Sequence, residues 1–414
     1  MSNSPQSAAT PILPRTLIVL NEAFVQVGSD YFSASVWWRF ARCLARHCRA
    51  TTLYVPLERR DEPGDAFRVE TEGLRIVGRP YYRRIQEYYQ NLSRWRDPLR
   101  RQLADLMADH DLVICRMPDP VAKLAAHAAV AAGRPLALFI GGDVRVGSIA
   151  TEARSVMLRI VGRLLGHLLR RQEEWVARRA CFVGLWDEQM KPRFAPLCSR
   201  VEICQSPTLT ADWLFERADT CIQAPFRLLR VCQLEPVKGL EAFFDAVRRL
   251  VEAGRDVHLD VAGGITRPAY AEELRARIAS AALGDRVRLK GNVPFGPELF
   301  ALYRRADVHV ISSKWEGLPR CLAEARASCA PTVATAVGSL PTAIRDGEDG
   351  LLVPPENPAA LAAAISRLID DGELRRRIIR NGYALAPRST AEYHAERIAR
   401  LVEEAMLSGA TKGR

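Results

Sequence analysis

The chain has 414 residues, of which 48% are hydrophobic and 26% are charged. That is enough for two or three domains with buried cores, and it excludes a disordered chain. No run of eighteen apolar residues occurs, which excludes an integral membrane protein. The net charge is +11, and residues 1–205 carry +9 of it, with 30 basic against 21 acidic residues. An anionic partner of the first half is therefore expected: nucleic acid, a membrane surface or an acidic substrate.

The cysteines and the N-terminus indicate the compartment. The ten cysteines form neither a C-x-x-C pair nor a Cys/His zinc spacing, so we expect reduced thiols and neither a metal site nor disulfides. The first fifteen residues lack the basic start and the apolar run of a secretory signal. A cytoplasmic protein is expected.

The first half alternates short apolar runs with helix-length segments. "TLIVL" (16–20) is followed by the loop "QVGSD" and a helical pattern at 33–47, and further apolar runs follow at 50–57, 74–78, 111–116 and 135–143. Alternation of this kind predicts βαβ units on a parallel sheet.

The same alternation restarts after an irregular stretch that ends near Pro225. Strands are predicted at 226–234, 257–264, 286–291, 306–313 and 331–335, and a well-patterned helix at 238–254. The sequence therefore predicts two α/β domains, 1–205 and 206–390, followed by a C-terminal helix within 391–414.

Two basic segments of the first half stand apart. "RPYYRRIQEYYQNLSRWRDPLRRQ" (79–102) interleaves aromatic residues with arginines, and 155–172 places arginines around one face of an apolar helix pattern. Both segments suit a peripheral contact with an anionic membrane, and both also suit ordinary helices packed on their own domain. Nucleic acid is not expected, because no groove-reading module accompanies them.

Two glutamates in "KWEGLPRCLAEA" mark the candidate site. Glu316 follows a predicted strand, at the edge of a parallel sheet where ligands of doubly wound folds bind. Glu324 lies on the helix that begins near Pro319, on which Leu322 and Ala325 begin the inward face. The free amides of Gly317 and Leu318 lie between the two acids and favour phosphate. This layout suits a nucleoside diphosphate sugar, although acids near a helix start are also common without function.

The residues "EGLPRCLAEA" followed by "PTVATAVGSLPTAIRDGEDGLLVPPENPAALAAAI" resemble the signature of the retaining GT-B glycosyltransferases of family 4. The resemblance is specific over roughly 226–370 and looser over the rest. It implies a GT-B fold, an α/β arrangement of two Rossmann-like domains with parallel sheets facing across a cleft. It also implies that the C-terminal helix within 391–414 crosses back to the first domain. It also implies that Glu324 holds the ribose hydroxyls and that Glu316 meets the hydroxyls of the donor sugar.

A second family element is a Gly-Arg-Leu strand end followed by Lys-Gly, where Arg and Lys clamp the diphosphate. In "CQLEPVKG", Lys238 and Gly239 match, and Gln233 replaces the arginine. Glutamine donates hydrogen bonds but brings no charge, so stabilisation of the leaving group would depend more on Lys238 and on the helix amides. Cys329 stands where the family usually ends the helix with glycine, in a left-handed backbone conformation.

The first half contributes weaker signals. Gly28 in "QVGSD" resembles the glycine loop that approaches donor or acceptor in this family, with an ordinary turn as the alternative. Asp143 lies after a predicted strand, in the region where other members place an acceptor-side histidine. We interpret Asp143 as orienting or deprotonating the acceptor hydroxyl, with a loop-capping aspartate as the alternative.

The resemblance implies a retaining, metal-independent hexosyltransferase without a cofactor. It would use a nucleotide diphosphate sugar as donor and a glycan or a lipid-linked acceptor, and it would act in bacterial surface polysaccharide or glycolipid synthesis. Glu316, Lys238 and Asp143 would be catalytic, and Glu324, Gln233, Gly317, Leu318, Gly239 and Gly28 would bind the donor. Two alternatives stay open: a catalytically degenerate GT-B partner subunit, which the neutral Gln233 favours, and a sugar-nucleotide epimerase of GT-B architecture.

Overall fold

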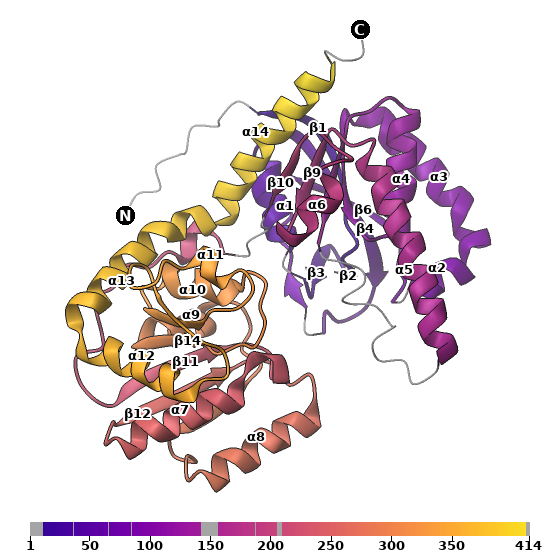
Figure 1. Cartoon of the computed structure of the whole chain (residues 1–414). Coiled ribbons are helices and arrows are strands. Elements are labelled where there is room, and N and C mark those ends of the chain that lie inside the picture. The colour runs from indigo at the N-terminus through magenta and orange to yellow at the C-terminus, as the bar shows by residue number, and fades with distance from the viewer. Residues whose placement is uncertain are drawn as a thin grey trace. The chain divides into compact units, whose positions relative to one another are not determined.

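The computed structural model describes residues 11–35, 37–64, 66–83, 85–141, 156–186, 188–204 and 209–410; for residues 85, 86, 156–165, 189, 409 and 410 it describes only the backbone. The chain divides into two compact units. The first comprises residues 1–208 together with 391–414, and the second comprises residues 209–390. Figure 1 shows both as sheets covered by helices.

The first unit is built on one sheet. In its described part the strands follow the order β10-β9-β8-β7-β1-β4-β2-β3-β5, and β6 also pairs with β4. The strands are β1 (Leu13–Val19), β2 (Phe24–Val27), β3 (Asp30–Ser33), β4 (Cys48–Arg59), β5 (Phe67–Arg68), β6 (Leu74–Pro80), β7 (Leu112–Met117), β8 (Leu136–Ile140), β9 (Phe182–Leu185) and β10 (Val201–Ile203). Pairing is parallel except for β2 with β3 and β3 with β5. The predicted parallel sheet is therefore confirmed, and the β2–β3 hairpin is an addition that the sequence pattern did not indicate.

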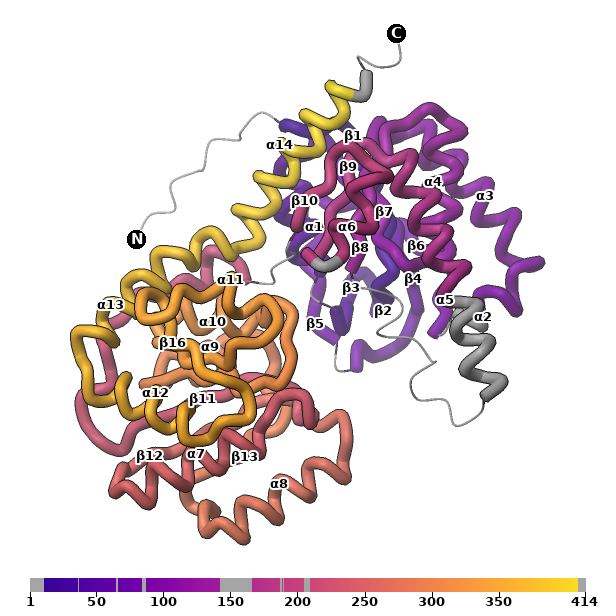
Figure 2. The backbone as a smooth tube through the Cα atoms, viewed as in Figure 1, coloured from indigo at the N-terminus to yellow at the C-terminus, as the bar shows by residue number. Residues whose placement is uncertain are grey.

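Helices cover both faces of this sheet. Their bounds are α1 (Trp37–Ala45), α2 (Ile85–Gln90), α3 (Leu92–Asp109), α4 (Pro120–Ala131), α5 (Val156–Ala177), α6 (Lys191–Phe194) and α14 (Ala391–Ala410). The apolar residues of α1 and α14 share one core with one sheet face, and those of α3 and α4 share a second core with the other face. The C-terminal helix α14, at the yellow end of the chain in Figure 2, thus packs on α1, the first helix of the chain.

The second unit has a six-stranded sheet in which every pair is parallel. Its strands are β11 (Phe226–Val231), β12 (Val257–Ala262), β13 (Val287–Gly291), β14 (Val308–Ile311), β15 (Thr332–Thr335) and β16 (Leu351–Val353). The strand order is β13-β12-β11-β14-β15-β16. The chain adds β12 and β13 on one side of β11 and then returns to add β14, β15 and β16 on the other side, so the order reverses between β11 and β14. Ligands of doubly wound folds bind beyond the carboxyl ends of the strands at this reversal.

The helices of the second unit are α7 (Leu240–Glu252), α8 (Pro268–Ser280), α9 (Pro297–Arg305), α10 (Arg320–Ala327), α11 (Leu340–Ala343), α12 (Pro358–Asp370) and α13 (Gly372–Leu385). One core joins α7, α8 and α12 to one face of the sheet, and a second joins α9 and α10 to the other. Figure 1 shows α7 and α8 together on one side of the strands.

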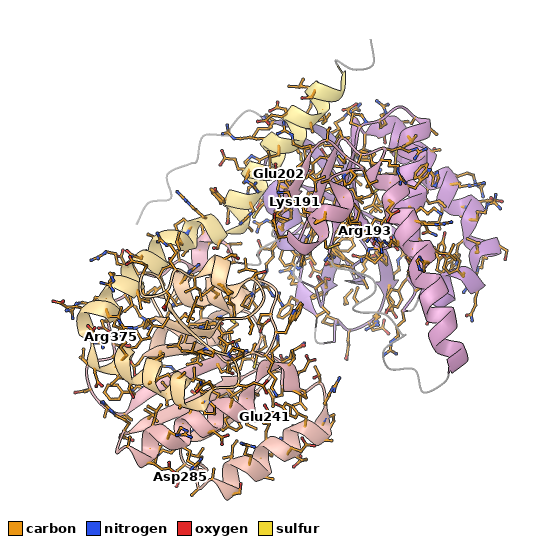
Figure 3. The ribbon with its side chains drawn as sticks, viewed as in Figure 1. Lys191, Arg193, Glu202, Glu241, Asp285 and Arg375 are labelled. Carbon is orange, nitrogen blue, oxygen red and sulfur yellow. The ribbon has the colours of Figure 1, made fainter. Side chains whose placement is uncertain are left out.

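Buried ion pairs fix the irregular parts of both units. In the first unit, Arg193 on α6 contacts Glu173 on α5 at 2.9 Å. In the second, Arg375 on α13 contacts Asp219 at 2.7 Å and so holds the segment that leads into β11. Arg193 and Arg375 are labelled in Figure 3. Both arginine side chains are largely buried, so loss of either partner would leave a charge unpaired in the interior.

Candidate active site

Two loops meet at the carboxyl edge of the second sheet, at the reversal of strand order. One loop follows β11 and runs through Gln233 to Gly239, and the other follows β14 and runs through Ser312 to Pro319. Hydrogen bonds connect them: Lys314 N donates to the Val237 carbonyl at 2.8 Å, and Ser312 Oγ donates to the Lys238 carbonyl at 2.9 Å. The parallel sheet thus brings side chains from distant parts of the sequence to one edge.

Glu316 lies in the β14 loop and is 7% exposed. Its Oε1 atom accepts hydrogen bonds from Lys238 Nζ at 2.9 Å and from Ser313 Oγ at 2.7 Å. Arg230 Nη2 lies 3.6 Å from the same oxygen. One carboxylate oxygen therefore faces two cations and a hydroxyl, an arrangement that fixes the orientation of the carboxyl group.

Glu324 lies on α10 and is buried, which is unusual for a glutamate. It is 6% exposed, and Tyr303 on α9 donates a 2.7 Å hydrogen bond to its Oε2. Burial raises the pKa of the Glu324 carboxyl, while the Tyr303 hydrogen bond and the nearby Arg320 partly oppose the shift. Leu322 and Ala325, predicted to face inward on this helix, are buried.

Glycines allow the loops of the site to approach closely. Gly239 has φ of +62°, and a Cβ there would lie 2.2 Å from the Ser312 carbonyl oxygen. Gly338 has φ of +54°, and a Cβ there would lie 1.6 Å from the Glu316 carbonyl oxygen. Neither position can hold another residue without moving the backbone. The match at Gly239 therefore has a physical reason, and Gly338, which the sequence analysis did not single out, supports Glu316 directly.

The backbone before α10 offers donors beside Glu316. Pro319 is the residue before the first helical residue, Arg320. Within the described part of the chain, the amides of Gly317 and Leu318 donate to no protein group. These N–H groups stand next to a helix N-terminus, which favours a negatively charged ligand.

Gln233 follows β11 and is exposed. The end of the neighbouring strand β12 lies close to the backbone of Gln233. A Cβ atom added at Gly263 would lie 3.2 Å from the backbone nitrogen of Gln233. The structure thus puts a neutral, solvent-accessible side chain on the rim of the edge that carries Lys238. Cys329, at the end of α10, has φ of +54°. This is the left-handed conformation in which the family usually has glycine.

Two of the predicted site residues, Gly28 and Asp143, belong to the first unit. Gly28 has φ of +59° and lies in the turn between the paired residues Val27 and Asp30 of the β2–β3 hairpin. A Cβ at Gly28 would meet no atom within 4 Å, so the backbone conformation of the hairpin turn by itself accounts for a glycine there. Asp143 lies outside the described residues.

Besides Gly338, three further residues of the site were missed from the sequence. Arg230, Ser313 and Tyr303 contact Glu316 or Glu324, and all are buried. Ser313 is adjacent to a strand end and could have been suspected from its position. Arg230 and Tyr303 carried no such signal. They lie within a strand and a helix, where the sequence pattern indicates secondary structure and does not indicate a binding role.

Together these groups can bind a ligand with hydroxyl groups at its two ends and phosphate between them. Carboxylates accept hydrogen bonds from hydroxyls, and Lys238 and the free amides favour phosphate. No group of three or more His, Cys, Asp or Glu side chains suited to a metal ion occurs in the described residues. The fold and this edge define an α/β protein of two doubly wound sheets with a site for an anionic ligand.

Comparison with known proteins assigns the second unit to a family. Residues 217–385 match the family described as glycosyl transferases group 1. Residues 217–385 therefore form a glycosyl transferases group 1 domain, which agrees with the resemblance seen in the sequence.

Relatives and solved structures agree with this assignment. A D-inositol 3-phosphate glycosyltransferase of Corynebacterium efficiens is 36% identical over 151 residues, which cover 36% of this chain and 35% of that protein. The lipopolysaccharide core biosynthesis mannosyltransferase LpsB of Rhizobium meliloti is 32% identical over 41% of this chain and 49% of that protein. The matched stretch is thus less than half of either relative.

Likeness of fold extends over nearly the whole chain. The structure of Anabaena Alr3699/HepE in complex with UDP superposes with a TM-score of 0.68, covers 94% of this chain and 100% of that chain, and is 17% identical. At this identity the comparison establishes the fold alone. The two parallel-sheet α/β domains resemble GT-B glycosyltransferases, as predicted.

Proposed function

We propose that this protein is a retaining glycosyltransferase that moves a hexose from a nucleotide diphosphate sugar to a glycan or lipid-linked acceptor. The observation that carries the proposal is the ion pair of Glu316 with Lys238 at the strand-reversal edge of a glycosyl transferases group 1 domain, with the buried Glu324 on the helix that follows. A nucleotide sugar donor is supported by the UDP bound in the structural neighbour.

The roles follow from the chemistry of each group. Glu324 accepts hydrogen bonds from the ribose hydroxyls, and Glu316 accepts them from hydroxyls of the hexose. Lys238 and the amides of Gly317 and Leu318 stabilise the charge that develops on the departing diphosphate. No carboxylate is evident as a covalent nucleophile among the described residues of this edge, so we favour a same-face reaction. In that reaction the acceptor hydroxyl attacks from the side that the diphosphate leaves, and the diphosphate takes up its proton.

A thermal-shift screen tests the donor site. UDP, GDP, ADP and their common sugar conjugates would be compared on the wild type and on Glu324→Ala, because a ligand that binds only the folded protein raises its melting temperature. We expect one nucleotide to stabilise the wild type and to lose that effect in the variant. Absence of any shift in the wild type would contradict the proposal and favour the degenerate partner subunit that Gln233 suggests.

The basic segment at 79–102 bears on the acceptor. The apolar residues Leu99, Leu103 and Leu106 of α3 are buried, and Tyr82 and Trp95 stack with ring centroids 6.3 Å apart. The helix therefore packs on its own domain, while Arg94, Arg96, Arg100 and Arg101 are exposed. No helix in the described part of the chain is long and apolar enough to cross a membrane.

We infer an electrostatic contact of α3 with anionic lipid, without insertion, which would bring the enzyme to a lipid-linked acceptor. Co-sedimentation with vesicles tests this contact. We expect binding to vesicles that contain phosphatidylglycerol, little binding to phosphatidylcholine, and loss of the difference when the four arginines are replaced by glutamine. Equal binding to both vesicle types at low salt would remove the inference.

A further inference from the structure

Arg230 is the last residue but one of a β-strand, and its side chain is entirely inaccessible to solvent. It lies on β11, the strand at which the sheet order reverses. Burying a guanidinium costs several kcal/mol unless its donors and its charge find partners. The contacts of Arg230 therefore have to explain why an arginine occupies this strand.

The hydrogen-bonding partners of Arg230 are few and mostly weak. Nη2 donates to Ser313 Oγ at 2.7 Å, while Nη1 lies 3.4 Å from the Val231 carbonyl and 3.8 Å from Cys321 Sγ. Nε has no hydrogen-bond partner among the described residues. The carboxylate that forms an ion pair with Arg230 is Glu316, at 3.6 Å. An arginine kept only for the stability of the core would be expected to have better-satisfied donors.

Ser313 connects the two charged groups. Its hydroxyl accepts the hydrogen bond from Arg230 and donates one of 2.7 Å to Glu316 Oε1. Glu316 is thus held from the protein interior through one direct charge contact and one hydroxyl relay. Both contacts join β11 to the loop after β14. The hydrogen bond between Arg230 and Ser313 connects residues that are 83 positions apart in the sequence.

Lys238 contacts the same carboxylate oxygen from the more open side. Its side chain is 20% exposed, whereas that of Arg230 is 0% exposed. An ammonium group has three N–H donors, and one of them is used on Glu316. Because Arg230 already balances the charge of Glu316 from inside, Lys238 can turn its remaining donors to an anion without leaving a buried carboxylate unpaired.

We propose that Arg230 is a positioning residue of the donor site, which fixes the Glu316 carboxylate from beneath, directly and through Ser313, and leaves Lys238 available to the phosphate groups of the donor. The proposal rests on the function proposed above. It assigns Arg230 its main effect on recognition of the hexose, through Glu316, and a smaller effect on the diphosphate, through Lys238, while recognition of the ribose lies with Glu324. The buried arginine is thus retained for the site and not for the stability of the sheet.

Arg230→Met tests the proposal, since methionine fills a similar volume and Glu316 keeps Lys238 as a partner. Arg227→Met, at an exposed arginine three residues earlier on the same strand, is the matched control. Affinities for UDP and UDP-glucose, or for the nucleotide and conjugate that the screen identifies, would be measured by calorimetry. We expect Arg230→Met to weaken binding of the conjugate by about tenfold or more and that of the free nucleotide by less than about threefold. Arg230→Lys, which keeps the charge, is expected to recover part of the conjugate affinity.

Equal affinities in the wild type and Arg230→Met would overturn the proposal. So would a loss of both affinities accompanied by a much lower melting temperature, because that result would make Arg230 a structural residue. Hydrogen exchange of the ligand-free protein provides a readout that needs no nucleotide. We expect faster exchange at residues 312–318 in Arg230→Met and unchanged exchange in α7. If the wild type binds no nucleotide but this exchange difference is found, the proposed function fails and the positioning role of Arg230 stands.

Discussion

Lys238 and Glu316 form an ion pair, with 2.9 Å between Nζ and Oε1, although 78 residues separate them along the chain. The pair lies at the reversal of strand order in a six-stranded parallel sheet. The cation therefore stands where phosphate binds in such folds, and the carboxylate beside it can accept hydrogen bonds from a sugar. Under the proposed function, both partners would contribute to the reaction.

Replacing Lys238 with methionine removes the cation closest to the open side of the site. We expect turnover of the donor to fall about 100-fold or more, because a charge aimed at a leaving group acts mainly in the transition state. Nucleotide affinity is expected to fall by much less. Steady-state donor consumption checks this, with the exposed Lys290→Met as the control. A loss confined to KM would contradict a role in leaving-group stabilisation.

The buried Glu324 predicts a pH dependence of stability. Its pKa is raised in the folded protein, first by burial, so the folded state binds a proton more tightly than the unfolded state does. The corresponding stability is fully present below the ordinary pKa of glutamate, about 4.3, and is lost as pH rises through the raised value. Glu324→Gln removes this titration and keeps an oxygen acceptor for Tyr303.

We therefore expect the free energy of unfolding of the wild type to fall relative to that of Glu324→Gln as pH increases from about 4. Urea denaturation of both proteins across this range measures the difference. A constant difference at every pH would show that the carboxyl titrates equally in both states. The same variant is expected to bind the nucleotide more weakly near neutral pH, because an amide accepts less strongly than a carboxylate from ribose hydroxyls.

Gly338 supports Glu316 by backbone contact, so Gly338→Ala is expected to disrupt the site. The added Cβ would lie 1.6 Å from the Glu316 carbonyl oxygen, and we expect a loss of roughly 2–4 kcal/mol in stability together with loss of nucleotide binding. Gly347→Ala is the matched control, because Gly347 also has positive φ, of +73°, but has free space around its Cβ position. It is expected to lose only about 1 kcal/mol. Equal losses in both variants would contradict the steric explanation.

Gln233 stands on the rim of the site without a charge, and Gln233→Arg tests whether the diphosphate is gripped there. We expect the affinity for a nucleoside diphosphate to increase by about fivefold to tenfold, since a charged donor to phosphate is worth roughly 1 kcal/mol more than a neutral one. Gln223→Arg, at an exposed glutamine before β11, controls for a general gain of charge. An equal increase in both variants would indicate long-range attraction instead of a local contact.

Local sequence pattern accounts for most of the fold. The apolar runs at 226–234, 257–264, 286–291 and 306–313 contain β11, β12, β13 and β14, because buried parallel strands read as short continuous apolar segments. The helix that carries Glu324 was likewise predicted, from Pro319 and the inward spacing of Leu322 and Ala325. The β2–β3 hairpin was missed, since a turn at Gly28 and Ser29 reads as an ordinary loop until its flanking strands pair.

The sequence by itself determined the two glutamates, Lys238 and the group to which the second domain belongs, because Glu316 and Glu324 sit in one short motif and Lys238 in another, and each motif can be recognised without the fold. Only the tertiary structure decided what surrounds them. Arg230 reaches Ser313 across two neighbouring strands, and Gly338 meets the backbone of Glu316. Sheet pairing brings such residues together over tens of positions in sequence, and no local pattern records which side of a strand an arginine will occupy.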